Sequence, residues 1–101
     1  MTSRETNADP ASTAADTSPV RSSITVPPDL VVGLLGSADE NLRALERTLA
    51  ADLHVRGNVV TLSGQPADVA LGERALSELI SIARRGQTLS PDVVRRTVEM
   101  L

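Results

Sequence analysis

Hydrophobic and polar residues are unevenly distributed along the chain, and the distribution changes near residue 24. Residues 1–23 are mostly Ser, Thr, Ala, Asp, Asn and Pro, and Val20 is the one Leu, Val or Ile among them. The other 26 of the chain's 27 Leu, Val and Ile residues come later. Residues 1–23 have too little apolar surface to offset the entropy lost on folding. We therefore expect them to be a disordered tail.

A short strand and a short helix are expected to open the folded part. Residues 23–26 have a β-type composition, and Pro27-Pro28 ends the strand because proline cannot donate to a sheet ladder. The apolar residues of 30–35 then lie on one helical stripe, and Gly36 is expected to end that helix.

A second helix is predicted to start at residue 37. Ser37 and Glu40 have the spacing of a capping box, in which the Ser37 side chain accepts a hydrogen bond from the Glu40 amide. The apolar residues that follow recur at helical intervals and predict one buried face, made of Leu42, Leu45, Leu49 and Leu53.

The second half of the chain predicts a hairpin and two more helices. Two β-type runs within residues 53–64 flank Gly57-Asn58, a dipeptide that favours a tight turn. Apolar residues hold a helical period from Pro66 to Gly86, and Ser90-Pro91 is a typical helix start. The order is therefore β-α-α-β-β-α plus a C-terminal helix. We expect an α+β fold with helices on one face of a three-stranded antiparallel sheet.

Composition excludes several classes of function. The chain has no Cys and no aromatic residue, and all ten of its basic residues are Arg. Without lysine there is neither a P-loop nor a Schiff-base site, and one histidine cannot build a multi-histidine metal site. We therefore expect no catalysis by this chain and no cofactor bound to it. The absence of cysteine, of a signal peptide and of a membrane-spanning run predicts a cytoplasmic protein without a membrane partner.

The run from Ile24 to Gly64, followed by a long helix, resembles a KH domain. More narrowly, LLGSADENLRALE (residues 34–46) and RGNVVTLSG (residues 56–64) resemble the N-terminal region of PhoH-like proteins, in which a KH-like segment precedes a P-loop ATPase domain. The resemblance covers residues 24–101. It implies a KH-like domain over 24–86 and a C-terminal helix over 87–101 that begins the connection to the ATPase domain. The chain itself does not include that domain, which would bind ATP and Mg²⁺.

The resemblance also suggests where nucleic acid would bind. KH domains clamp a nucleic-acid backbone with a G-x-x-G loop between their two short helices. Here this loop is residues 36–39, in which Asp39 replaces the second glycine and Glu40 follows. Two carboxylates therefore stand where phosphate would approach. The candidate nucleic-acid residues are Gly36, Ser37, Arg43 and Arg56. Alternatively, Arg43 and Arg47 pair with Asp39, Glu40 or Glu46 along one helix surface.

The acidic loop decides between two functions. We expect a non-catalytic accessory module of a PhoH-like protein, which positions or regulates the ATPase domain through protein contacts. The partner would be that domain or another protein surface. The alternative is a weak single-stranded RNA-binding module, with RNA as the partner.

Overall fold

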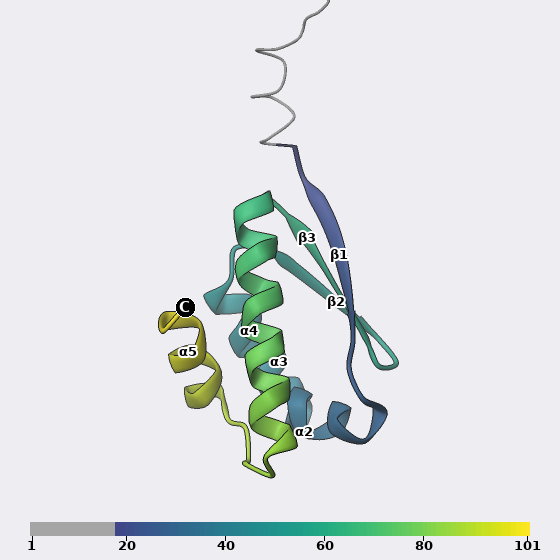
Figure 1. Ribbon diagram of the computed structural model, residues 1–101, viewed down its shortest axis with the longest axis vertical. Coiled ribbons are helices and arrows are strands. Elements are labelled where there is room, and N and C mark those ends of the chain that lie inside the picture. The colour runs from purple at the N-terminus through teal and green to yellow at the C-terminus, as the bar shows by residue number, and fades with distance from the viewer. Residues whose placement is uncertain (1–17) are drawn as a thin grey trace, which may run out of the picture.

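The computed structural model describes residues 18–101, which form a three-stranded sheet with helices on one of its faces (Figure 1). The predicted α+β class and the β-α-α-β-β-α order with an additional C-terminal helix are confirmed. The elements are β1 (Val20–Thr25), η1 (Pro28–Leu30), α2 (Val31–Leu35), η2 (Ser37–Asp39), α3 (Glu40–Thr48), β2 (Asp52–Arg56), β3 (Val59–Gly64), α4 (Pro66–Arg84) and α5 (Pro91–Glu99).

The sheet is antiparallel, with the strand order β1-β3-β2. The predicted hairpin is formed by β2 and β3, and Gly57 in its turn has φ 61°, a value that glycine adopts at little cost. Side chains alternate between the two faces of the sheet. The face toward the helices is mainly apolar and includes the buried residues Leu53, Val60 and Leu62.

Strand β1 begins earlier than predicted. Residues 20–23 were expected in the disordered tail, but they pair with β3 in a register that runs from Val20 opposite Gly64 to Thr25 opposite Val59. Polar side chains support this pairing, since the Ser23 hydroxyl lies 3.1 Å from that of Thr61. A polar strand lacks the apolar alternation that predicts strands, which is why the boundary was misplaced. The rest of the expected tail, residues 1–17, lies outside the described residues.

Helix α4 packs along the sheet and supplies much of the core. It buries Val69, Gly72, Ala75, Leu76 and Leu79, the face predicted from the helical period. The 19-residue helix is the longest in residues 18–101, but neither it nor any other helix there has the length and hydrophobicity needed to cross a membrane.

The buried face of α3 differs from the predicted one. The helix ends at Thr48, so Leu53 lies in β2 instead of on the helix, and Leu42 is only partly buried. Its buried residues are Asn41, Ala44 and Leu45. A 3-10 turn at residues 37–39 precedes α3 and sets the rotation of the helix, which sequence periodicity did not reveal.

Helix α5 shares the core of the other elements. Val94 and Val98 are buried in the same cluster as the sheet residues, and α5 packs against α3 and α4. The predicted start is confirmed, because the Ser90 side chain accepts a hydrogen bond from the Val93 amide at 3.3 Å. Although residue 86 was the expected domain boundary, the hydrophobic core continues across it to Val98.

Candidate functional site

The loop between α2 and α3 has an unusual backbone. Gly36, Ala38 and Asp39 all have positive φ, at 80°, 51° and 57°. Residues with a side chain rarely adopt such values, and glycine adopts them readily. Asp39 occupies the position where the resembled KH loop has its second glycine. The backbone at this position therefore has a conformation that favours glycine, although the side chain is a carboxylate.

The predicted capping box is wrong. The Ser37 side chain caps no helix, and α3 begins at Glu40 with the left-handed residue Asp39 before it. The Asp39 amide instead donates to the Gly36 carbonyl at 3.2 Å, which closes the 3-10 turn. With this turn inserted, Ser37 lies outside α3.

Asn41 connects the two helices on either side of the loop. It is fully buried, and its Nδ2 donates to the Gly33 carbonyl in α2 at 3.3 Å. A Cβ added to Gly36 would lie 2.8 Å from the same nitrogen, so only glycine fits there. Sequence reasoning missed Asn41, although it shares a helical face with Ala44 and Leu45, which lie three and four residues later. Its Oδ1 is buried and has no hydrogen-bond partner within residues 18–101.

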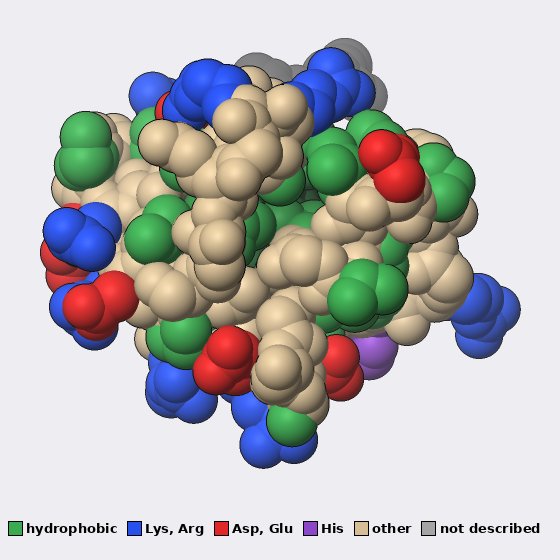
Figure 2. Space-filling view, turned by 90° about the horizontal axis from the view of Figure 1, so that it is seen from below, with side chains coloured by type: hydrophobic (Ala, Val, Ile, Leu, Met, Phe, Trp, Pro, Cys, Tyr) green, Lys and Arg blue, Asp and Glu red, His purple; other side chains and the backbone are tan. Residues whose placement is uncertain are grey.

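Charged side chains at the start of α3 remain separate. Asp39, Glu40, Arg43 and Arg47 are exposed, and none of them forms an ion pair within residues 18–101. The alternative in which Arg43 and Arg47 pair along the helix is therefore wrong for this structure. Figure 2 shows charged side chains of both signs around the edge of the molecule's lower end, with hydrophobic side chains both between them and toward the centre.

The four candidate nucleic-acid residues fall into two groups. Gly36 and Ser37 lie in the loop and Arg43 follows on α3, whereas Arg56 ends β2. Arg56 lines a hollow of about 550 Å³ whose other lining residues all come from the sheet, mostly from the face away from the helices. These are Arg21, His54, Val55, Val59 and Thr61. No local pattern in the sequence connects Arg56 with Arg21, because they line one hollow only through the pairing of both strands with β3.

A hydrophobic surface lies where α5 ends beside α4. Met100 is 85% exposed and Leu101 is 39% exposed. Together with Ile82 of α4 they line a hollow of about 350 Å³, which Glu78 and Thr97 complete. We call this set of five residues the α5-end surface. Large apolar side chains exposed next to one another are typical of contact sites.

Over its whole length, the chain is similar to part of several longer proteins. A PhoH-like protein of Mycobacterium tuberculosis is 72% identical over 102 residues, which cover 100% of this chain and 29% of that protein. A PhoH-like protein of Mycobacterium leprae is 67% identical over 101 residues, covering 100% of this chain and 28% of that protein. One from Bacillus subtilis is 27% identical over 73 residues, or 72% of this chain and 23% of that protein. No family model and no solved structure matches the chain.

The element order and the loop define a small α+β module of KH-like topology. Over its whole length, this chain is similar to one region of PhoH-like proteins. It spans about 29% of the length of the relatives that match it over its whole length.

The loop backbone generates a stability prediction. Asp39→Gly should raise the free energy of unfolding by about 0.5 to 1 kcal/mol, because glycine relieves a left-handed conformation. Ser37→Ala, the control, should change it by less than about 0.5 kcal/mol, since no cap is lost. Urea unfolding followed by circular dichroism measures both changes. A loss of about 1 kcal/mol with Ser37→Ala, or with Asp39→Gly, would contradict this description of the loop.

Proposed function

We propose that this region is a non-catalytic accessory module of a PhoH-like protein, which positions or regulates the ATPase domain implied by the family resemblance through protein contacts. The observation that carries the proposal is that the whole chain is similar to about 29% of a PhoH-like protein. We place the contact at the α5-end surface. Its exposed apolar atoms would be removed from water by a partner, which contributes about 25 cal/mol per Å² buried. The module would act in the cytoplasm, as expected for a chain without cysteine.

Contact at this surface would be transmitted to the module's core. Val94 and Val98 are buried on α5, the helix that Met100 directly follows, and Thr97 between them is 8% exposed. The Thr97 hydroxyl also donates to the Val93 carbonyl at 2.7 Å. A partner bound at the end of α5 would therefore be held by a helix that is fixed along its length.

The chemistry of the side chains supports a non-catalytic role. The single histidine, His54, is exposed on the sheet and forms no hydrogen bond or ion pair within residues 18–101. Ser37 likewise has no hydrogen bond that would activate its hydroxyl. A nucleophile needs a base within hydrogen-bond reach, and neither residue has such a partner.

Two equally exposed hydrophobic residues provide the test. Met100→Asp should weaken binding of this chain to the remaining part of the Mycobacterium tuberculosis PhoH-like protein by about tenfold or more, because it places a charge in the apolar contact. Val32→Asp is the control, since Val32 is 81% exposed but lies on α2. Isothermal titration calorimetry measures the affinities, and circular dichroism checks folding. Failure of the unmodified chain to bind, or equal losses in both variants, would overturn the proposal.

A second candidate function, binding of single-stranded RNA, is favoured by the hollow on the sheet. Arg21, His54 and Arg56 line it with the Thr61 hydroxyl, and Asp52 is the one carboxylate on the three strands. Cations and a hydroxyl at one exposed surface suit contacts to phosphate. The location differs from the acidic loop, where two carboxylates oppose phosphate.

Salt dependence tests the RNA candidate. Replacing Arg21 and Arg56 together by Gln should weaken binding of a single-stranded RNA and reduce the slope of log affinity against log salt by about 1 to 2. The matched control replaces Arg95 and Arg96 by Gln on α5. Fluorescence anisotropy measures both. Equal effects in the two pairs would count against the sheet hollow, and binding that appears only with Asp39→Gly plus Glu40→Lys would place RNA at the loop.

A further inference from the structure

The two edges of the sheet are protected to different degrees. β2 forms one edge and carries ionisable side chains at alternate positions, namely Asp52, His54 and Arg56. Such residues prevent an edge strand from pairing with another chain. β1 forms the other edge and has a single charged residue, Arg21, near its start. Within residues 18–101 no strand pairs with its outer side, so β1 is the edge that is open to another strand.

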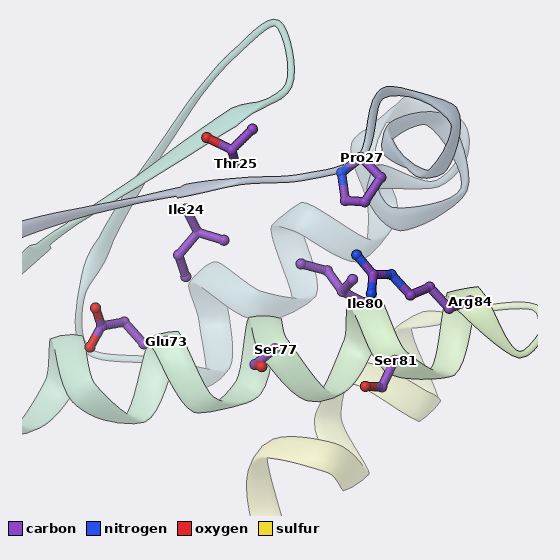
Figure 3. Close-up of a pocket in the computed structure, with 8 residues that line it drawn as sticks. All are labelled: Ile24, Thr25, Pro27, Glu73, Ser77, Ile80, Ser81 and Arg84. Carbon is purple, nitrogen blue, oxygen red and sulfur yellow. The ribbon is translucent and has the colours of Figure 1, made fainter.

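A groove of about 410 Å³ runs beside this open edge, between β1 and α4 (Figure 3). Ile24 points from β1 toward the helix, and Glu73 and Arg84 stand at opposite ends of the helical stretch that faces it. The residues of α4 that line the groove are Glu73, Ser77, Ile80, Ser81 and Arg84.

The spacing of these residues makes one continuous stripe. Glu73, Ser77, Ile80 and Arg84 follow one another at steps of four, three and four residues. Side chains at this spacing lie on one face of a helix and can pack against a second helix. Glu73 and Arg84 are about 16 Å apart along the axis. Ser77 is small enough to let another helix approach closely.

Of the two charged residues at the ends of the stripe, one has a hydrogen-bond partner and the other has none within residues 18–101. The Glu73 carboxylate accepts a hydrogen bond from the Ser22 hydroxyl of β1, which directs it from α4 toward that strand. The Arg84 side chain is exposed and forms no hydrogen bond or ion pair within residues 18–101. A carboxylate and an unpaired guanidinium thus stand at opposite ends of the same surface.

We propose that two copies of this chain associate through β1 and α4 about a two-fold axis. Antiparallel pairing of β1 with β1 of the second copy extends the sheet to six strands. The axis passes midway between Ser77 and Ile80, from which Glu73 and Arg84 are equally distant. Each Glu73 therefore lies opposite Arg84 of the second copy, and each Ser77 opposite Ile80 of the second copy.

A second copy fits this surface better than an unrelated strand because the stripe is self-complementary. A two-fold interface places the same surface on both partners, so every residue must find its match within one stripe. Opposite charges at equal distances from the centre, and a small residue beside a large one, meet this condition. The surface does not include Met100 or Leu101, so the association is independent of the function proposed above.

Reciprocal charge variants test the proposal. The unmodified chain should show a concentration-dependent dimer by sedimentation equilibrium in the micromolar range, about 1 to 100 µM. Arg84→Glu and Glu73→Arg should each weaken self-association by about tenfold or more, since each places like charges together twice. A 1:1 mixture of the two variants should associate again, because both contacts of the mixed dimer then join Arg with Glu. Arg85→Glu is the control, as Arg85 does not line the groove.

Two further measurements keep the result unambiguous. Glu73→Arg also removes the hydrogen bond from Ser22 and could therefore disturb folding, which circular dichroism checks. If that variant does not fold, two samples decide: Arg84→Glu by itself, and Arg84→Glu mixed with the unmodified chain. The affinities should then rank the unmodified dimer first, the mixture second and the variant last. Amide exchange should slow with concentration at alternate residues of β1. A monomer at all concentrations, or a dimer that is insensitive to both charge variants, would overturn the proposal.

Discussion

The close approach of α4 to the sheet is the constraint on which the other layers depend. Gly72 is buried where the helix meets β3, and a Cβ added there would lie 3.0 and 3.2 Å from the two δ-carbons of Leu62. Leu62 is itself fully buried in the centre of the sheet. The same Cβ would lie 3.5 Å from Leu49, which follows α3. Glycine at this position thus lets one helix contact the sheet and the α3 region at once.

Because α4 is fixed in this way, its other faces are fixed too. One of them forms the groove with β1, through Ile80 and its neighbours. Another contacts α5 and contributes Ile82 to the α5-end surface. The proposed contact with a second copy and the proposed contact with the rest of a PhoH-like protein therefore use separate surfaces of one helix. The loop at Asp39 forms a third surface of the molecule, away from α4. The buried Asn41 next to this loop is hydrogen-bonded to α2.

The sequence predicted those parts of the fold that depend on local patterns. The α4 periodicity, the Gly57 turn and the Ser90 cap were all identifiable because each arises from residues close together in the chain. The site was predicted less well. Arg56 was singled out without Arg21, since their proximity depends on strand pairing across the sheet.

The errors have three different physical origins. Polar residues 20–23 became a strand through pairing with β3, which no local pattern of apolar residues signals. The capping box at Ser37 matched its motif, but two left-handed residues displaced the helix start to Glu40. Asn41 was overlooked because a buried polar residue gives no hydrophobic signal.

One comparison of two glycines tests the central constraint most directly. Gly72→Ala should lower the free energy of unfolding by about 1 kcal/mol, since crowding against Leu62 outweighs the gain in helix propensity. Gly33→Ala should raise it by about 0.5 to 1 kcal/mol, because a Cβ there meets no atom within 4 Å. Urea unfolding by circular dichroism measures both. Equal stabilisation by the two substitutions would show that α4 does not depend on close contact at Gly72.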